Sequence, residues 1–454
     1  MRPVNRLPPE ALTRIVQYVP DERDTDAMSI LILTHVCRYW RGVITSTPWN
    51  WKSVSNRSHP LAEFSLKCAK SVSLEISVDM MLVRKNPGFS DVIRPHVRNT
   101  KSIHFAMIGK IKDLTQAIPN FPQSMPNLQS LAVDAHYIHR SQVDPFESLA
   151  PTLRYLELNH TRLYPSLLRL RALKEVVIRI FSFSLHFDTF LDFLEQNHSL
   201  ESVTLEVIFE GLPQGVFRHR SINMTKLKHL SIGPDRLEDA SALIRSIPLK
   251  RGAHLEVVDK SALESKDALS DIPTAHLANL SSPTSMEYHN PSDGKVIRLF
   301  GPNGSFSYQK PDQREEPFEE FPVLPLDSIR EVRLIACNQT CKAFDPSFFP
   351  SLEMLALIRE QLPSSVLSTV LSNPYSLPKL KTLAFLGCDL CEDFMEELMR
   401  FASGRRNTSS AWLHRMVIVD SRGNLPNVGS LDALEKYVPV VDVRVGKELP
   451  KDLA

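Results

Sequence analysis

A pattern of three apolar residues, separated by two positions and then by one, recurs along most of this chain. The first series comprises Leu128/Leu131/Val133, Leu153/Leu156/Leu158, Leu173/Val176/Ile178, Leu200/Val203/Leu205 and Leu227/Leu230/Ile232. The second comprises Ile329/Val332/Leu334, Leu352/Leu355/Leu357, Leu380/Leu383/Phe385 and Leu413/Met416/Ile418, with weaker copies at Val72/Leu74, Ile103/Phe105 and Val438/Val441/Val443. Successive first positions differ by 25, 20, 27 and 27 residues, then by 23, 28 and 33. This period indicates a chain of many small, similar units.

Each unit reads as a strand followed by a helix. Helical spacing between the strands is clearest in Phe187/Phe190/Leu191/Leu194 and in Phe394/Leu398/Phe401. Such a unit cannot bury its apolar face alone, but stacking buries it. The period matches that of leucine-rich repeats, so the sequence predicts an α/β fold with an irregular leucine-rich-repeat solenoid of parallel strands. An ordinary α/β fold is the alternative, and it would need longer βαβ units and a Gly-rich ligand turn.

Apolar residues at helical spacing also occur close to the N-terminus. The stretch LPPEALTRIVQYVP, residues 7–20, has two prolines where a first helical turn tolerates them, and then an apolar stripe at Leu12, Ile15, Val16 and Val19. Residues 27–33 are almost wholly apolar, which predicts a second short helix that is buried on most sides. Thr34 is expected to cap a third helix with Val36, Trp40 and Val43 along one face.

Three short helices of this size bury too little surface to be stable alone. Trp40, Trp49 and Trp51 supply more large apolar groups than their core needs, so some are expected to face another protein. A helical cap that packs on the rest of this chain remains a second interpretation. A DNA-reading unit is disfavoured, because the third helix offers only Arg38 and Arg41 as cations.

The order and spacing of these residues resemble the F-box throughout residues 5–51. The residues that match are Leu7-Pro8-Pro9-Glu10, Leu12, Ile15, Val19, Val36-Cys37-Arg38-Tyr39-Trp40-Arg41, Ile44 and Trp51. With its repeats, the chain resembles F-box leucine-rich-repeat proteins, including fungal ones whose repeats are similarly degenerate. Residues 21–26 depart from the pattern, because they are longer and more acidic than a compact F-box loop.

This resemblance implies a short three-helix F-box that docks on the Skp-type adaptor of a cullin-RING (SCF-type) ubiquitin ligase. It implies adaptor contacts by Leu7, Pro8, Glu10, Leu12, Ile15, Val36, Cys37, Trp40 and Ile44. The repeats would bind a protein client of unknown identity, which other subunits ubiquitinate, so the chain would be a non-catalytic substrate receptor in the cytoplasm, the nucleus or both. A scaffold that binds without promoting degradation is the alternative.

The repeat pattern is interrupted at residues 258–325. Residues 296–308 predict a β-hairpin around Gly301-Pro302-Asn303-Gly304, because Asn-Gly supplies the positive φ of a tight turn. Residues 310–322 are typical of an exposed acidic linker. Residues 258–325 form either a structured lobe over one repeat or a flexible insertion, and both alternatives remain. The predicted domains are an F-box at 1–54, repeats at 55–257, the insertion at 258–325 and further repeats at 326–454.

The cysteines fall at two of the repeats. Cys337 and Cys388 each lie three residues beyond the last apolar residue of a triad, which is the turn position that Asn or Cys fills in leucine-rich repeats. A structural role is therefore expected. A zinc site formed with Cys341 and Cys391 is the alternative, since the spacing within each pair is tolerable.

The remaining sequence gives no catalytic signal. No nucleophile elbow, zinc-protease motif or phosphate loop is found, so we expect no enzyme activity and no cofactor.

The 53 basic and 52 acidic residues leave a net charge of +1, which gives no reason to expect nucleic acid or an anionic membrane as a partner. No stretch has the apolar length of a bilayer span. Three histidines fall in or just after the early strands: His104, His136 and His160. They are either binding residues on the sheet face or solvated surface residues.

Overall fold

The structure is a computed structural model of the 454-residue chain. It describes residues 7–18, 27–83, 85–86, 88–107, 125–135, 152–161, 163, 167–211, 220–233, 237–259, 277–289, 294–310, 324–335, 344–359, 363–373, 375–388, 390–407, 412–420 and 428–445. The chain forms two compact units, the first from Met1–Gly215 with Asn223–Lys226 and the second from Val216–Ile222 with Leu227–Ala454. The predicted domain boundaries at residues 54, 257 and 325 stay predictions.

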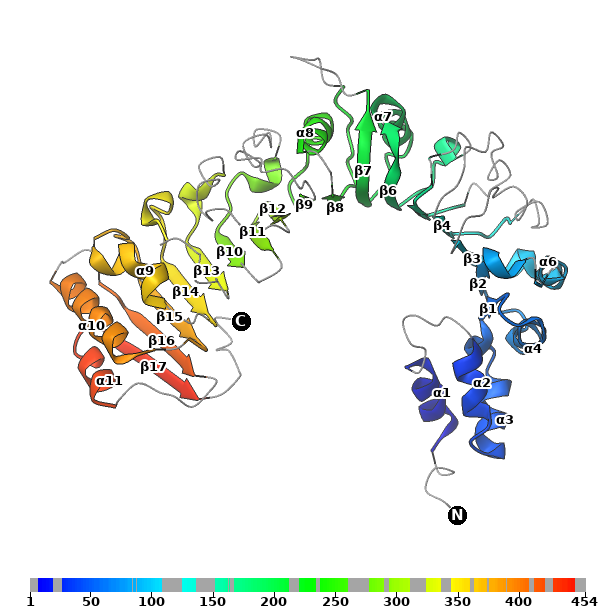
Figure 1. Cartoon of the computed structure of the whole chain (residues 1–454), viewed down its shortest axis with the longest axis horizontal. Coiled ribbons are helices and arrows are strands. Elements are labelled where there is room, and N and C mark those ends of the chain that lie inside the picture. Colours follow the sequence, from blue (N-terminus) through cyan, green and yellow to red (C-terminus); the bar gives the residue numbers. More distant parts are fainter. Residues whose placement is uncertain are drawn as a thin grey trace. The chain divides into compact units, whose positions relative to one another are not determined.

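The first unit opens with three helices and continues as a parallel sheet (Figure 1). The helices are α1 (Pro9–Gln17), α2 (Ala27–Thr34) and α3 (Arg38–Ser46), followed by a 3-10 turn at Pro48–Trp51. The strands are β1 (Ser53–Ser55), β2 (Leu74–Asp79), β3 (Thr100–Met107), β4 (Ser130–Ala135), β5 (Tyr155–Asn159), β6 (Glu175–His186) and β7 (Ser202–Glu210). Helices α4 (His59–Ala69), α5 (Met80–Val83), α6 (Phe89–Ile93) and α7 (Phe187–Gln196) lie between them in sequence, with 3-10 turns at Arg94–Asn99 and Leu167–Arg169.

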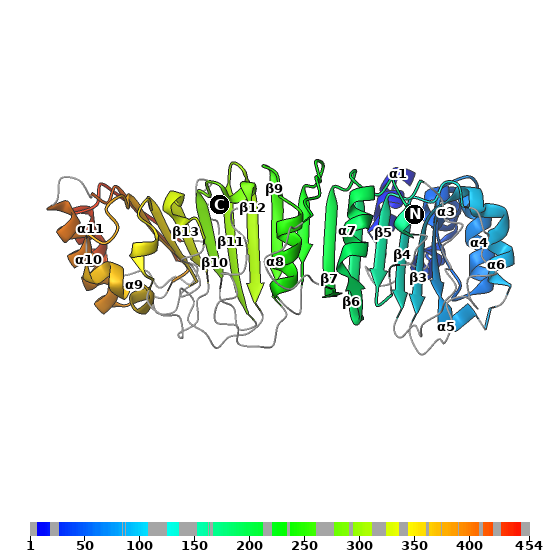
Figure 2. The ribbon, with the colours of Figure 1, turned by 90° about the horizontal axis from the view of Figure 1, so that it is seen from above.

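These seven strands pair in chain order, each parallel to the next. Figure 2 shows β3 to β7 lying side by side. The middle residues of the apolar triads are aligned Cα partners across the sheet, as Leu131, Leu156, Val176 and Val203. All four side chains are buried. The predicted strands 128–133 to 200–205 are confirmed, because side chains that alternate along a strand line one face in every strand of the same register.

Helix α7 covers the face of the sheet to which the triads point. Phe187 and Phe190 on this helix pack against Phe209 of β7, with ring centroids 5.2 and 5.7 Å apart. The predicted helical spacing at residues 187–194 is therefore confirmed. The residues that alternate with the triad residues along β5 and β7 point to the opposite face, where their side chains are half-buried or exposed, while Val177 on this face of β6 is buried.

The second unit contains a sheet in which one strand is reversed. Its strands are β8 (His229–Ile232), β9 (Ala253–Val258), β10 (Ser285–His289), β11 (Lys295–Gly301), β12 (Gly304–Lys310), β13 (Glu331–Ile335), β14 (Met354–Ile358), β15 (Thr382–Leu386), β16 (Arg415–Asp420) and β17 (Val440–Val445). The helices are α8 (Leu237–Ser246), α9 (Pro363–Ser372), α10 (Glu392–Arg406) and α11 (Val428–Glu435), with 3-10 turns at Ala278–Leu280, Leu326–Ser328 and Pro346–Phe348. The spatial order is β8-β9-β12-β11-β10-β13-β14-β15-β16-β17. Among these pairings, β11 alone is antiparallel to its neighbours.

The predicted hairpin is confirmed, with Gly301 and Gly304 as the last paired residues of β11 and β12. It lies within the sheet, because β12 pairs with β9 and β10 pairs with β13. Neither a lobe over the repeats nor a flexible insertion describes these strands. The main chain at Gly304 has φ of +128°, and a Cβ there would lie 2.3 Å from the carbonyl oxygen of Ala253. Only glycine allows this close approach of β12 to β9. Residues 311–323, most of the predicted acidic linker, lie outside the described residues.

The triads after residue 326 follow the same rule as those of the first unit. Val332, Leu355, Leu383 and Met416 are Cα partners in succession, and all are buried. Phe385 of β15 meets Phe394 of α10 edge to face at 5.4 Å. This part of the prediction is therefore confirmed as well. Within the described residues, no helix is long and apolar enough to span a bilayer.

Candidate functional site: an N-terminal helical unit and the open sheet face

The three N-terminal helices are joined by side chains that reach between them. Leu12 of α1 and Ile44 of α3 are fully buried, and Trp40 is nearly so. The Tyr39 hydroxyl donates to the carbonyl oxygen of Leu7 at 2.8 Å, which fixes the residue before α1 to α3. Arg41 Nε donates to the carbonyl oxygen of Thr34 at 3.1 Å and ties α3 to the end of α2.

The cap of α3 differs from the predicted one. Thr34 is the last residue of α2, and its hydroxyl donates to the carbonyl oxygen of Leu31 at 2.6 Å. Cys37 is the N-cap residue, and its Sγ accepts from the amide of Trp40 at 3.4 Å. The prediction of a Thr34 cap was therefore wrong, because α2 extends to residue 34 and the side chain that caps α3 is that of Cys37.

Trp51 joins the three helices to helix α4. This side chain is fully buried, and its Nε1 donates to the carbonyl oxygen of Ile44 at 2.9 Å. Its ring meets Phe64 of α4 edge to face, with centroids 5.0 Å apart. Trp49, two residues earlier, is 61% exposed. The surplus of tryptophan that the sequence shows is thus divided between an internal anchor and an exposed ring.

The nine residues predicted to contact an adaptor fall into three groups by exposure. Leu12, Trp40 and Ile44 are covered by the chain itself. Leu7 and Cys37 are half-buried. The exposed group comprises Pro8, Glu10, Ile15 and Val36. Leu12, Trp40 and Ile44 hold the helices in place, while the exposed group is directly accessible to a partner.

Helix α2 exposes large apolar side chains on one face. Met28 is 44% exposed and Ile32 is 63% exposed, and four residues separate them, so they share one face of the helix. Ile30 and Thr34 on the other side are buried. The sequence predicted burial on most sides of residues 27–33 but did not indicate which face is exposed, because a nearly all-apolar sequence does not tell which of its sides a neighbouring element covers. Exposed apolar side chains of this size indicate an interaction surface.

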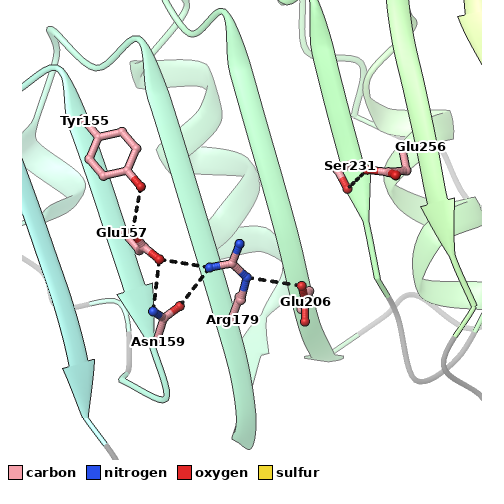
Figure 3. A network of polar contacts seen from close by, with 7 residues as sticks. All are labelled: Tyr155, Glu157, Asn159, Arg179, Glu206, Ser231 and Glu256. Atoms are coloured by element: carbon pink, nitrogen blue, oxygen red, sulfur yellow. Dashed lines mark hydrogen bonds and ion pairs between the residues drawn. The ribbon is translucent and has the colours of Figure 1, made fainter. Parts of the chain in front are cut away.

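A second candidate surface is the face of β5 to β7 that is opposite α7, where a polar network links three strands (Figure 3). Arg179 of β6 lies between two carboxylates: its Nη1 donates to Glu157 Oε1 at 2.9 Å and its Nε donates to Glu206 Oε1 at 3.2 Å. Glu157 also accepts from the Tyr155 hydroxyl at 2.6 Å and from Asn159 Nδ2 at 3.1 Å.

The network changes the acidity of its members. Burial, the hydrogen bond to Glu157 and the negative charge of that carboxylate raise the pKa of Tyr155 above its ordinary value. Burial by itself would raise the pKa of Glu157, but the hydrogen bonds from its neighbours outweigh it and hold this pKa below the ordinary value. Glu157 is therefore a carboxylate at neutral pH, and Tyr155 is a neutral donor. The arrangement holds and orients the guanidinium of Arg179 between two carboxylates.

In the second unit, polar side chains again line the sheet face. His229 and His254 are Cα partners on β8 and β9, and their rings stack with centroids 5.1 Å apart. His254 Nδ1 lies 2.6 Å from Ser305 Oγ. Burial and the neighbouring His229 lower the pKa of His254. On the same two strands, Ser231 donates to Glu256 at 2.7 Å, as Figure 3 also shows.

The other predicted candidates are only partly described. Cys388 donates to the carbonyl oxygen of Leu357 at 3.3 Å and Cys391 is exposed. Cys337, Cys341 and His136 lie outside the described residues, so the zinc alternative is not tested. Elsewhere, no group of three or more His, Cys, Asp or Glu side chains in the described part of the chain could hold a metal ion. His104 is exposed on β3, and the amide of His160 donates to the carbonyl oxygen of Arg179.

The comparison with protein families concerns the helical unit. Residues 4–57 match the F-box-like family. This range contains α1 to α3, the Trp51 anchor and β1. No curated protein sequence matches the chain. The resemblance of residues 5–51 to the F-box is confirmed, and the N-terminal unit of this chain is an F-box-like domain.

Proposed function

We propose that this chain is a substrate receptor of an SCF-type ubiquitin ligase. The F-box-like domain docks on a Skp-type adaptor, and through it on a cullin, while the sheet binds a protein client. The observation that carries the proposal is the F-box-like match at residues 4–57, in a unit that exposes apolar side chains on α1 and α2. Pro8, Glu10, Ile15 and Val36 are the predicted adaptor contacts that lie exposed, and we add Met28 and Ile32.

The rest of the chain fits a leucine-rich-repeat solenoid in this proposal. The last two residues of each full triad lie in a strand, and the aligned triads form one buried row in each unit. The weak copy at Val72/Leu74 is the exception, since Ile76 and Val78 are the residues that align with Ile103 and Phe105. Cys388 supports the leucine-rich-repeat interpretation. It occupies the turn position of the repeat, and its thiol donates a hydrogen bond to the carbonyl oxygen of Leu357 on the neighbouring strand β14. The open face of such a sheet presents rows of side chains to a protein partner.

The proposal assigns no catalytic step to this chain. A receptor that holds a client beside the ligation subunits raises the effective concentration of the client's lysines, and this alone accelerates ubiquitin transfer. The second candidate is a scaffold that binds adaptor and client without promoting turnover. The F-box-like domain supports both equally, and the fate of the client distinguishes them: a receptor's client accumulates on proteasome inhibition, and a scaffold's does not.

The adaptor contact is tested by co-purification of the full chain with a Skp-type adaptor. The test variant is Ile32→Asp, which places a charge on the exposed face of α2. The matched control is Tyr375→Asp, which changes an equally exposed apolar side chain in the second unit. We expect Ile32→Asp to lower capture by tenfold or more, because it buries a charge without a partner, and Tyr375→Asp to leave capture unchanged. Failure of the unaltered chain to capture the adaptor would remove the proposal.

A further inference from the structure

We propose that the open face of strands β4 to β7 binds a basic, Arg- or Lys-containing segment of the client protein. This inference rests on the proposed function, since it names the chemistry of the client that the receptor would hold. It concerns the side of the sheet opposite α7, hereafter the β4–β7 face, and its rows are Ser130/Tyr155/Glu175/Ser202, Ala132/Glu157/Val177/Thr204 and Asp134/Asn159/Arg179/Glu206.

The β4–β7 face carries an excess of negative charge that the whole chain lacks. Its three rows include four carboxylates and one guanidinium, whereas the 454 residues together have a net charge of +1. Arg154 directly precedes β5 and Lys174 directly precedes β6, and Lys174 pairs with Glu201 at 3.2 Å. The carboxylates of β4, β5 and β6 are diagonal to one another from strand to strand, which places such side chains about 7–8 Å apart, within one Debye length of about 10 Å, so their fields add over the face.

The internal guanidinium shows what the face can hold. Arg179 is bound on two sides, by Glu157 on β5 and by Glu206 on β7, through charge-assisted hydrogen bonds of 2.9 and 3.2 Å. The strand spacing thus places carboxylates at the separation that one guanidinium bridges. Glu175 lies two residues before Val177 on β6, and therefore on the same face as Val177 and Arg179. Its side chain is exposed and offers a further carboxylate.

Tyr155 adds an aromatic ring beside these carboxylates (Figure 3). Its hydroxyl is held by Glu157, and Glu175 is its Cα partner on the next strand. A half-buried ring next to carboxylates suits the stem of a lysine or the plane of an arginine, which pack on aromatic faces while their charges pair with acids. The same charges repel phosphates and acidic peptides, so nucleic acid and acidic clients are disfavoured.

The test measures peptide binding to the full chain by fluorescence anisotropy. The probe is a labelled twelve-residue peptide of alternating Arg and Ser, and its counterpart has Glu in place of Arg. We expect the basic peptide to bind, and its affinity to fall as salt is raised from about 0.05 M to about 0.5 M, where screening is strong. The acidic peptide is expected not to bind.

Three variants locate the binding. Glu175→Gln removes one negative charge from the face and is expected to weaken binding of the basic peptide about two- to five-fold. Arg179→Gln removes the guanidinium that occupies Glu157 and Glu206, and it is expected to strengthen binding of the basic peptide by a similar factor. Asp188→Asn removes one exposed negative charge from α7, on the other side of the sheet, and is expected to leave the affinity unchanged.

Each contrary outcome overturns the inference. Equal weakening by Asp188→Asn and Glu175→Gln would mean diffuse attraction to the whole chain. Binding of the acidic peptide as tightly as the basic one, or of neither, would exclude a basic client segment at this face. Adaptor capture by the same preparations keeps the two proposals apart: capture without peptide binding removes this inference alone, and peptide binding without capture removes the proposed function alone.

Discussion

The guanidinium of Arg405 donates from Nη1 to the carbonyl oxygen of Leu377 at 2.9 Å, so helix α10 is tied to the loop that precedes β15. Its Nη2 donates to the carbonyl oxygen of Leu380 at the same distance, and the ring of Phe401 lies 5.4 Å from the cation. The side chain is fully buried, and desolvation lowers the pKa of Arg405 to about 10. It therefore stays charged at neutral pH, and hydrogen bonds to carbonyls offset the burial of that charge.

Replacing Arg405 should destabilise the second unit. Arg405→Met removes two charged hydrogen bonds and leaves two carbonyl groups without these donors, which we expect to lower the free energy of unfolding by about 2–4 kcal/mol. Urea denaturation followed by circular dichroism measures it. Arg400→Met on the same helix, where the side chain is exposed, is the control and should change stability by less than about 0.5 kcal/mol. Equal effects of the two variants would contradict the assigned role.

Truncation of two tryptophans in one turn should change stability to very different extents. Trp51→Ala opens a cavity beside Phe64 and Ile44, and we expect it to lower stability by about 3–5 kcal/mol. Trp49→Ala changes an exposed ring and should leave the unfolding midpoint nearly unchanged. Thermal unfolding of both variants gives the answer. If Trp49→Ala were the more harmful, the F-box-like domain would not be anchored through Trp51.

Two glycines should differ in their tolerance of alanine. Gly304→Ala forces a Cβ toward the Ala253 carbonyl oxygen at a φ of +128°, and we expect a loss of about 2 kcal/mol or more. Gly42→Ala, in the exposed part of α3 with open space around it, should gain up to about 1 kcal/mol through helix propensity. Unfolding midpoints in urea compare them. A neutral Gly304→Ala would mean that β12 does not approach β9 this closely.

Stability should depend on pH through His254. Because the pKa of this imidazole is lowered below its ordinary value of 6.5, the unfolded chain binds the proton more readily than the folded chain. Its contribution is therefore fully present above pH 6.5 and is lost as pH falls from 6.5 through the folded-state pKa. The slope is at most about 1.4 kcal/mol per pH unit for one proton. In His254→Gln the melting temperature should fall less between pH 7.5 and pH 5 than it does in the control His198→Gln, which changes an exposed histidine. If both variants show the same dependence on pH, His254 is not the source of that dependence.

The sequence predicted most of the strands and their register, because the register follows from a short-range rule. Leu131, Leu156 and Val176 must all point to the covered face, and a slip of one residue would expose every one of them. The place of the hairpin could not be predicted in this way. Asn-Gly specifies the turn at residue 303, but the pairing of Ser305 with His254 depends on which edge is free when the sheet assembles.

The candidate surfaces were predicted less completely than the fold. Residues 5–51 showed the F-box pattern, but they did not show that Leu12 and Ile44 are covered while Met28 and Ile32 are exposed. Exposure depends on the neighbouring helices, which one apolar stripe does not specify. The network around Arg179 joins residues 22 and 27 positions away from it, so no local motif reveals it.

The order of strands around the hairpin sets the sequence of events when the second unit folds. Most neighbouring strands in this chain pair across one repeat of about 20–30 residues, so each can add to the last as soon as it is made. β9 can likewise add to β8, but its other edge pairs with β12, and His254 meets Ser305 across 51 residues of chain. Closing that long loop is slower than adding the next strand. Assembly should therefore pause at β9 until the hairpin has formed, which makes β9–β12 pairing a candidate for the rate-limiting step.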